Sequence, residues 1–515
     1  MPNRVRRRIR FQTTALGAAT FTIGCCVHAA TSSAAPVDRY GKPHIVYILA
    51  DDMGYGDPGC QNPQSKIPTP HLDALASQGI RFTDAHSPAA VCTPTRYGIL
   101  TGRYCWRTRL TKSVLWPWDP PLIEADRLTV PKLLKKHGYR TACIGKWHLG
   151  WDWPTTDGKR PVSNSRGENV DFTRPIGGGP TTRGFDYYFG TAVPNFPPYC
   201  FIKNNRTVGL PTETKPKTMF GHPGPMLPGW KLVDILPTLT QQAVDYIRDA
   251  AKQPRRPFFL YFPLTAPHTP IVPAAQFQGK SDAGLYGDFV HQVDWTVGQV
   301  INALEETGLA RNTLVIFTSD NGSPARNGKN ASGPAGSVIK EFGHNPNRPL
   351  RGMKADIWEG GHRVPFIARW PERIKTGATN DELICQTDLL ATCAAILGEA
   401  LPENAGEDSY NILPALLSAR RDKPIREAVV HHSGQGRFAI RQGRWKLITS
   451  LGSGGWSRPR SAKPEPGGPR GQLYDMAKDL SERHNLWLES PDVVERLTKL
   501  LERYKSEGRS APRRR

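Results

Sequence analysis

Residues 44–57 read HIVYILADDMGYGD, and this stretch decides how the chain folds. Its first seven residues form a short apolar run, and two aspartates and a glycine-containing turn follow directly. Three later stretches repeat this design, because each is an apolar run that leads into polar residues: YRTACIG at 139–145, PFFLYFPL at 257–264 and NTLVIFTSD at 312–320. Apolar runs of this length, bounded by glycine and proline, are typical of strands buried on both faces in a parallel sheet.

Helical patterns lie between these four runs. They are TPHLDALASQG (69–79), LTVPKLLKKHG (128–138), LTQQAVDYIRDAA (239–251) and DFVHQVDWTVGQVINALEETG (288–308). Strands that alternate with helices predict a doubly wound α/β fold with a mostly parallel sheet. In such sheets the ligand crevice lies at the carboxyl ends of the strands, and the polar residues that follow all four runs fall there.

The residue pattern of the sequence changes after about residue 422. The segment AVVHHSGQGRFAIRQGRWKLITS (428–450) predicts antiparallel strands, and SPDVVERLTKLLERYKSEG (490–508) predicts a final helix. We therefore expect a larger domain at 36–422 and a smaller C-terminal α+β domain at 423–515.

The chain begins like an exported protein. MPNRVRRRIRF carries five arginines, and the apolar run ALGAATFTIGCCV (15–27) and the small residues HAATSSAA (28–35) follow. This order is typical of a secretory signal peptide, which we predict at 1–35. The apolar run is too short to span a bilayer comfortably, so we expect a secreted or periplasmic protein, with a permanent anchor as the alternative.

The formal charge of +22 favours anionic partners. Nucleic acid is one such partner, but the sequence has neither a zinc finger nor a basic helical stripe, and its positive charge is scattered. A sulfated or otherwise anionic substrate fits the charge equally well.

Seven of the nine cysteines remain after removal of the signal peptide. Six of them could form disulfides in an oxidising compartment, in combinations that the sequence leaves open: Cys60, Cys105, Cys143, Cys200, Cys385 and Cys393. Cys92 is then the odd cysteine.

Two of the strand ends carry a candidate metal site. Asp51 and Asp52 follow the first run, and Asp320 and Asn321 follow the last. A parallel sheet would bring them together, and three carboxylates at one place are unfavourable without a cation. Ligands that are all oxygen atoms indicate Ca²⁺ or Mg²⁺ rather than zinc. The alternative is that both segments are ordinary turns, in which Asp, Asn and Gly are common.

The segment VCTPTRYGILTGRY (91–104) places Cys92 at the start of a predicted helix. Pro94 suits the first helical turn, and thiolates and oxyanions are favoured at the positive end of a helix. The alternative is that Cys92 is half of a disulfide. A tyrosine-phosphatase loop is excluded, because it requires arginine six positions after the cysteine, where this chain has Gly98.

Three further polar residues follow the middle strands. Lys146 and His148 are two positions apart, so that in an extended segment both side chains would point to the same side. His268 follows the run at 257–264. Each of these signals is weak when taken alone.

Taken together, these segments resemble the type I sulfatases, and most closely the arylsulfatase A branch. The resemblance rests on CTPTRYGILTGRY, ILADDMGYGD, GKWHLG, APHTP, TSDNG, RGMKADIWEGGHRVPFIARWP and QLYDMAKDLSERHNL, which occur in the family's order and spacing over essentially the whole mature chain. It implies an alkaline-phosphatase-like fold and the hydrolysis of sulfate monoesters, such as carbohydrate or aryl sulfates. One departure is Thr95, where the family more often has serine.

The resemblance also implies that Cys92 does not stay a thiol. In this family a maturation enzyme oxidises the cysteine of Cys-x-Pro-x-Arg to formylglycine, whose hydrate has two hydroxyls on one carbon. One hydroxyl attacks the sulfur of the ester, and the other expels sulfate after the alcohol has left.

Roles for the remaining site residues follow from the same resemblance. A divalent metal, with calcium favoured over magnesium, is held by Asp51, Asp52, Asp320 and Asn321. Arg96 and Lys146 neutralise sulfate and hold the hydrate, and His148 is the base for the elimination. His268 and Lys354 bind sulfate and protonate the leaving oxygen.

Two other functions remain open from the residues. A phosphomonoesterase or phosphonate hydrolase of the same superfamily would share the fold and the metal site. A non-catalytic protein that binds sulfated polymers would use only the basic surface.

Two segments are predicted to shape the leaving-group pocket. They are FDYYFGTAVPNFPPYCFIKN (185–204) and EFGHNPNRP (341–349), with His344 as a contact. The long loops at 152–182 and 322–350 are expected to shape the same site.

Overall fold

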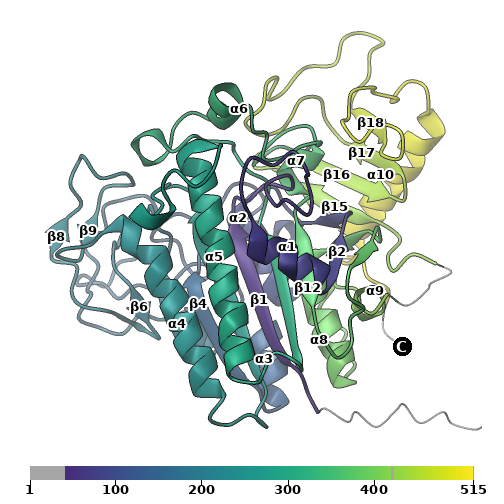
Figure 1. The fold of residues 1–515 in the computed structure, drawn as a ribbon. Coiled ribbons are helices and arrows are strands. Elements are labelled where there is room, and N and C mark those ends of the chain that lie inside the picture. The colour runs from purple at the N-terminus through teal and green to yellow at the C-terminus, as the bar shows by residue number, and fades with distance from the viewer. Residues whose placement is uncertain (1–40, 419–422, 514–515) are drawn as a thin grey trace, which may run out of the picture. The chain divides into compact units, whose positions relative to one another are not determined.

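A ten-stranded sheet forms the centre of the structure (Figure 1). The computed structural model describes residues 41–418 and 423–513, and the predicted signal peptide lies outside them. The strand order is β13 (Ala378–Asn380), β2 (Ile80–Phe82), β12 (Phe366–Arg369), β11 (Thr313–Ser319), β1 (His44–Asp51), β10 (Phe258–Pro267), β4 (Arg140–Lys146), β5 (Tyr187–Thr191), β6 (Ile202–Lys203) and β7 (Arg206–Thr207).

The middle of this sheet is parallel, as the sequence predicts. β11, β1, β10, β4 and β5 run in one direction, and the four predicted runs are four of these five strands. In the register of the sheet, Asp51 lies opposite Pro267 of β10, and Ala50 lies opposite Ser319 of β11. The strand ends that carry the polar residues therefore meet at one edge. The antiparallel pairings of β12 with β11 and β2, and of β6 with β5 and β7, were not predicted.

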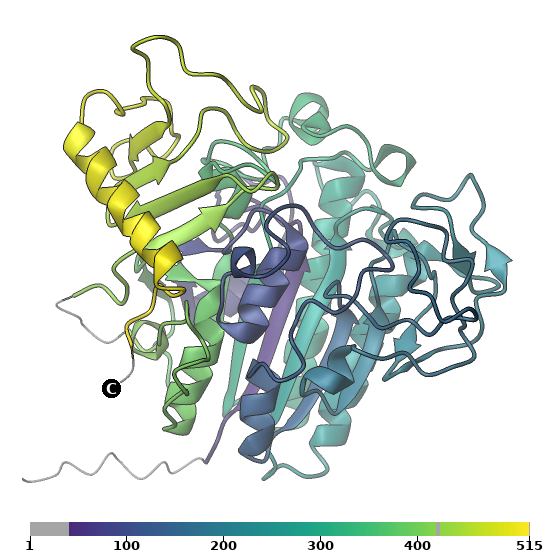
Figure 2. The same ribbon diagram turned by 180° about the vertical axis from the view of Figure 1, so that it is seen from behind.

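Helices cover both faces of the sheet, because alternate residues of β1 pack in opposite directions. Val46 and Ile48 pack with α1 (Pro70–Ser77), α4 (Ile235–Ala250) and α5 (Gly284–Glu306), which lie in front of the sheet in Figure 1. Ile45 and Tyr47 pack on the other face with α2 (Cys92–Thr101), α3 (Val130–Lys136) and α8 (Leu389–Leu397), the face seen in Figure 2. Full burial on both faces explains why β1 is a continuous apolar run rather than an alternating one.

The C-terminal part forms a separate four-stranded antiparallel sheet, as predicted. Its strands are β15 (Val429–His432), β16 (Phe438–Gln442), β17 (Trp445–Ile448) and β18 (Gln472–Asp475), and α10 (Pro491–Ser506) packs on it. The described residues from Lys42 onward form one compact unit. The predicted domain boundary at 422/423 adjoins residues 419–422, which lie outside the described part of the chain, and it stays a prediction.

The remaining elements are short. They are β3 (Ala85–His86) with β14 (Ile384–Cys385), β8 (Glu213–Thr214) with β9 (Pro225–Met226), and the helices α6 (Ser337–Phe342), α7 (Glu359–His362) and α9 (Leu413–Leu416). Within residues 41–418 and 423–513, no helix is both long enough and apolar enough to cross a membrane.

The predicted disulfides are not formed. All seven cysteines of the described residues are free thiols, and every one except Cys60 is buried. Cys105, Cys143, Cys385 and Cys393 fill apolar positions in the interior, which is a common role of free cysteine.

Candidate active site

Cys92 is the first residue of α2, and all ten residues of this helix are buried. Val91 before it is extended, so the chain turns into the helix at the cysteine. The predicted helix is therefore confirmed, but the expected stabilisation of the thiolate is wrong for the unmodified side chain. Burial raises the pKa of the Cys92 thiol to about 12, and the nearby ammonium groups of Lys146 and Lys354 offset only part of this effect.

The structure brings the four candidate metal ligands together at the C-terminal end of β1. Asp51, Asp52, Asp320 and Asn321 are each between 0 and 2 % exposed. The Asp52 backbone N–H donates to Asp320 Oδ1 at 3.2 Å, and Asn321 Nδ2 donates to Asp52 Oδ1 at 2.7 Å. Side-chain oxygen atoms from two distant chain segments thus lie close together in the interior.

Three cations surround these carboxylates. Lys146 Nζ lies 2.6 Å from Asp51, Arg96 Nη2 lies 2.8 Å from Asp320, and Lys354 Nζ lies 2.6 Å from Asp52. Although burial alone would raise it, the charges of Lys146, Arg96 and Lys354 hold the pKa of Asp51 well below its ordinary value. Burial and the negative charge of Asp51 instead raise the pKa of Asp320 to about 7. The three cations therefore stabilise the negative charge of Asp51 more than that of Asp320.

These residues fit a hard divalent cation. Asn321 Oδ1 is buried and has no hydrogen-bond partner among the described residues, so an acceptor is left available beside the carboxylates. The donor set of carboxylate and amide oxygens is the one that Ca²⁺ and Mg²⁺ prefer. A divalent cation beside Asp320 would also favour the ionised form of this carboxyl, whose pKa burial and Asp51 raise.

A cavity of about 430 Å³ opens beside Cys92. Four predicted site residues line it: Cys92, His148, His268 and Lys354. Cys92 Sγ lies 3.6 Å from Lys354 Nζ and 3.6 Å from Asp51 Oδ1, so the sulfur joins the cavity to the carboxylate cluster.

Arg96 and Lys146 lie behind Cys92 and not among the residues that line the cavity. The Arg96 guanidinium donates to Asp320 Oδ2 through Nε and Nη2 and to the Lys146 carbonyl through Nη1. Because Arg96 and Lys146 are both fully buried and paired with carboxylates, their position suits them to hold the cluster rather than to touch a ligand in the cavity.

His148 adopts a left-handed conformation with a φ of 52°. The predicted extended geometry of residues 146–148 is therefore wrong, although His148 still lines the cavity. Its Nε2–H donates to the Leu115 carbonyl at 3.0 Å, whereas Nδ1 is buried without a partner among the described residues. Burial and the charges of Lys146 and Arg96 hold its pKa well below the ordinary value, so the ring is a neutral base with a free lone pair.

His268 is also a neutral ring in this structure. Its Nδ1–H donates to the Thr269 carbonyl at 2.6 Å, and its Nε2 lies 3.8 Å from Asp52 Oδ2. Burial lowers the pKa of His268 to about 4. Lys354 differs from it, because the Asp52 carboxylate outweighs burial and raises the pKa of the ammonium above its ordinary value.

The other cavity residues come from several parts of the chain. Asn195 and Phe196 belong to the predicted segment 185–204, but Ser113, Gln435, Trp456 and Arg460 were not predicted. The last three lie in the C-terminal part. Trp456 and Arg460 belong to a Gly/Pro-rich segment at 452–471, and Gln435 lies next to it. The composition of this segment predicts a loop and nothing about the cavity. No local sequence signal connects that loop with Cys92.

The prediction for the segment 341–349 is wrong. His344 is buried and contacts Asp57 Oδ1 through Nε2 at 2.9 Å, so it supports the turn after β1. Neither this segment nor the loops at 152–182 and 322–350 line the cavity.

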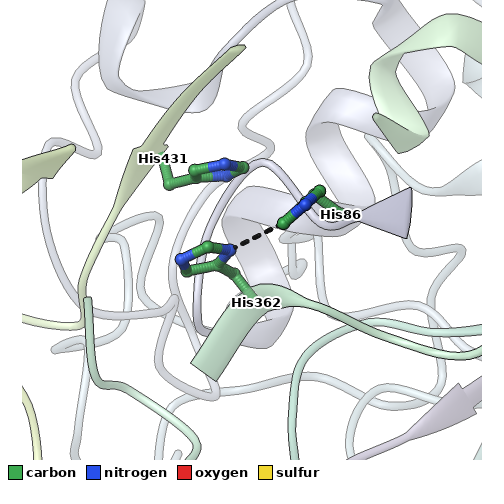
Figure 3. A group of neighbouring side chains, drawn as sticks. All are labelled: His86, His362 and His431. Carbon is green, nitrogen blue, oxygen red and sulfur yellow. Dashed lines mark hydrogen bonds between the residues drawn. The ribbon is translucent and has the colours of Figure 1, made fainter. Parts of the chain in front are cut away.

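A cluster of three buried histidines lies where the C-terminal sheet meets the main part of the chain (Figure 3). His86 is in β3, His362 ends α7, and His431 is in β15. His86 lies in the same chain segment as Cys92, His362 in that of Lys354, and His431 in that of Gln435. The His431 ring stacks on that of His362, with ring centroids 3.9 Å apart.

The nitrogen atoms of this cluster form a chain of hydrogen bonds. Lys446 Nζ donates to His362 Nε2 at 3.0 Å, His362 Nδ1 lies 3.0 Å from His86 Nδ1, and His86 Nε2–H donates to Asp84 at 2.8 Å. Burial lowers the pKa of each of the three histidines, so the rings are neutral. The parallel stacking of His431 on His362 also prevents their in-plane lone pairs from converging on one ion. We therefore interpret the cluster as a hydrogen-bonded junction rather than a metal site.

Lys446 is the central cation of this junction. It is fully buried, and its Nζ lies 2.9 Å from Glu359 and 2.8 Å from Glu482. Lys446 belongs to β17, whereas Glu359 begins α7, five residues after Lys354. The ion pair thus connects the C-terminal sheet to the segment that carries Lys354.

Comparisons with known proteins agree with this geometry. Residues 43–399 match the protein family described as Sulfatase. The chain is 35% identical over 508 residues to the N-acetylgalactosamine-6-O-sulfatase of Bacteroides thetaiotaomicron, covering 90% of this chain and 93% of the relative. It is 33% identical over 470 residues to human arylsulfatase A, covering 86% and 83%. A solved chain from a glycosaminoglycan-metabolism locus of Bacteroides thetaiotaomicron has a TM-score of 0.77 and 33% identity, covering 90% of this chain and 99% of that chain.

The junction makes a prediction about stability. Lys446→Met leaves Glu482 buried without its cation and leaves Glu359 only its longer contacts with Arg363 and Arg441. Breaking a buried ion pair costs about 3–5 kcal/mol. We expect the free energy of unfolding, measured by urea denaturation, to fall by this amount.

The matched control is Lys499→Met, which removes an ammonium paired with Glu495 at the protein surface. Exposed pairs contribute little, so this variant should unfold at the same urea concentration as the wild type. Equal stability of the two variants would show that the buried junction does not hold the structure together.

Proposed function

This chain belongs to the sulfatase family and hydrolyses sulfate esters, and we propose that its nucleophile is a formylglycine made from Cys92 and that its substrates are carbohydrate sulfates. The fold is the alkaline-phosphatase-like one that the resemblance implies. The observation that carries the proposal is the position of Cys92. It stands at the buried start of α2, between the Lys354 ammonium and the carboxylate of Asp51, and it borders the cavity.

A thiol at this position is a poor nucleophile, because its raised pKa leaves almost no thiolate at neutral pH. Formylglycine supplies, as its hydrate, one hydroxyl that bonds to sulfur and a second that drives the release of sulfate. The Cys-Thr-Pro-Thr-Arg sequence at 92–96 supports this modification, which requires a maturation enzyme as a partner. Thr95 leaves the backbone undisturbed, since its hydroxyl donates to the Ala89 carbonyl at 3.1 Å.

Asp51, Asp52, Asp320 and Asn321 would hold the cation, and we favour calcium because several anionic oxygens are available. A bound divalent cation acts as a template and stabilises negative charge on the sulfate oxygens. Lys146 and Arg96, which do not line the cavity, hold the carboxylates in place. Their fixed charges suit a site where negative charge develops during the reaction.

His148 is the base in this proposal. Its Nδ1 carries a free lone pair, and the hydrogen bond from Nε2 to the Leu115 carbonyl fixes the ring. In the release step Nδ1 takes the proton of the second hydroxyl while the bond to sulfate breaks.

Lys354 and His268 act together on the sulfate group and on the leaving oxygen. The Lys354 ammonium is charged and lies 3.6 Å from Cys92 Sγ, which suits it to bind sulfate. It shares the delivery of a proton to the leaving oxygen with His268, although its raised pKa makes it the weaker acid. His268 is neutral in the empty cavity, and a bound anionic sulfate ester next to Nε2 would raise its pKa and allow it to donate as well.

The carbohydrate part of the proposal rests on the relatives and on the cavity. The bacterial relative is an N-acetylgalactosamine-6-O-sulfatase, so 6-sulfated N-acetylgalactosamine is the first compound to assay. The signal-like segment at 1–35 supports a secreted or periplasmic location, where such saccharides would be met.

The first test compares sulfate with phosphate. We expect kcat/KM for 4-nitrophenyl sulfate to exceed that for 4-nitrophenyl phosphate by at least about 10-fold, which is 1.4 kcal/mol of discrimination. Cys92→Ala, assayed in parallel, should remove both activities. A preference for the phosphate ester would support the phosphomonoesterase alternative.

The second test concerns the modification. Peptide mapping of active protein should find an aldehyde at position 92, trapped as a hydrazone. Protein produced without a maturation enzyme should be folded and inactive, because the thiol is protonated and buried. Fully active protein that carries only a thiol at Cys92 would contradict the proposed nucleophile.

The third test concerns His268 and depends on the leaving group. A sugar alkoxide needs a proton as it leaves, whereas 4-nitrophenolate needs little help, and general acid catalysis contributes about 10²–10⁴-fold. We therefore expect His268→Ala to lower kcat/KM for a carbohydrate sulfate by about 10²-fold or more, and by far less for 4-nitrophenyl sulfate.

His148→Ala is the matched control, because the base acts after the alcohol has left and its loss should slow both substrates. Equal losses on both substrates for His268→Ala would reduce His268 to a sulfate-binding residue. Lys354 would then be the acid.

A further inference from the structure

The wall of the cavity carries one positive charge that has no partner. Arg460 lines the cavity and is exposed, and the described residues form neither a hydrogen bond nor an ion pair with its guanidinium. The other lysine or arginine that lines the cavity is Lys354, which Asp52 neutralises. No aspartate or glutamate is among the described residues that line it.

Arg460 belongs to a loop that is fixed against the catalytic segment. The backbone N–H groups of Trp456 and Ser457 donate to Asp356 Oδ1 at 2.7 and 3.0 Å, and Asp356 is two residues after Lys354. The Gly454 N–H donates to the Arg460 carbonyl at 2.9 Å, which closes the loop at its far end. Little ordering of the loop backbone is therefore required when the guanidinium binds a ligand.

Gly455 explains how closely this loop approaches. A Cβ atom at this position would lie 2.3 Å from the Ala355 backbone, so only glycine permits the contact. This contact places Trp456 beside Lys354 at the cavity wall.

Trp456 presents an apolar platform in the same wall. Trp456 is 37 % exposed, and two cations lie near its ring, with Lys354 Nζ 5.8 Å and the Arg326 guanidinium carbon 5.4 Å from the ring centroid. An indole that is fixed and still accessible offers a flat apolar surface for the C–H face of a sugar ring.

Asn195 adds a polar contact to this surface. Its Oδ1 is buried at the cavity and has no partner among the described residues. An unpaired acceptor of this kind is unfavourable unless a ligand donates to it. Sugar hydroxyl and acetamido N–H groups are suitable donors.

We propose that the cavity recognises a sulfated sugar within a saccharide that bears a second anionic group, and that Arg460 binds this second group. The inference rests on the proposed function, because it takes the sulfate at Cys92 as given. Trp456 packs on the sugar, and Arg460 forms a two-point contact with a carboxylate or a second sulfate on the neighbouring sugar. Arg460 is thus a residue for substrate specificity and not for the chemical step.

The test uses the sulfated monosaccharide that the wild-type enzyme hydrolyses fastest, extended to three disaccharides. The second sugar carries a carboxylate in one, a sulfate in another, and no charge in the third, which is the carboxyl-reduced form of the first. Arg460→Gln removes the charge, Arg460→Lys retains it, and Arg470→Gln is a control in the same loop region that does not line the cavity.

The KM of the wild type for an anionic disaccharide should be about 10-fold lower than its KM for the neutral one. This difference corresponds to one charged hydrogen-bond contact. Arg460→Gln should abolish this preference by raising KM for the two anionic disaccharides to that for the neutral one. Arg460→Lys should restore part of the preference, and Arg470→Gln should retain all of it. The better of the two anionic disaccharides identifies the second group as carboxylate or sulfate.

Three results would overturn the inference. They are a wild type that shows no preference for an anionic neighbour, an Arg460→Gln variant that loses activity equally on all three disaccharides, and hydrolysis of 4-nitrophenyl sulfate without hydrolysis of any saccharide sulfate. Failure to hydrolyse 4-nitrophenyl sulfate, in protein verified to carry the aldehyde, would instead refute the proposed function together with the inference that rests on it.

Discussion

The structure depends on how three buried carboxylates at the edge of one sheet are neutralised. Asp51, Asp52 and Asp320 lie in an interior where unpaired charges are strongly unfavourable. Lys146 contacts Asp51, Lys354 contacts Asp52, and Arg96 contacts both Asp320 and Asp51. Each of these cations comes from a different element or loop. The start of α2, the end of β4 and the segment after β11 are therefore held at the same place by one electrostatic requirement.

Several features of this arrangement could be predicted because they follow from chain direction. Parallel strands end at the same edge, so four apolar runs followed by polar residues were sufficient to place Asp51 and Asp320 together. The start of α2 at Cys92 could be predicted as well, since Pro94 is compatible only with a first helical turn.

Other features depend on contacts between distant segments and could not be predicted. The φ of His148 and the hydrogen bonds of Arg96 are set by neighbours that follow or precede them by tens of residues. The positions of Trp456 and Arg460 depend on Asp356, about a hundred residues earlier. The raised pKa of the Cys92 thiol could not be predicted for the same reason, because a helix start is visible in the sequence and full burial is not.

The C-terminal sheet is part of the active site as well as a separate sheet. Ala90, two residues before Cys92, donates its N–H to the His432 carbonyl, and Gly434 donates to the Ala355 carbonyl next to Lys354. The cluster of His86, His362 and His431 lies behind these contacts, together with the ion pairs of Lys446. Because the same three segments form the cavity wall, a disturbance of the junction would displace both Cys92 and Lys354.

The most direct test of this account is a calorimetric titration of Ca²⁺ into metal-free protein, with metal removal verified by elemental analysis. The account predicts one ion bound per chain, and much weaker binding in Asn321→Ala, which removes the unpaired acceptor and leaves the fold and all charges intact. Metal-free protein that binds no calcium and hydrolyses sulfate esters at the full rate would contradict it, because the carboxylate cluster would then be neutralised by the chain alone.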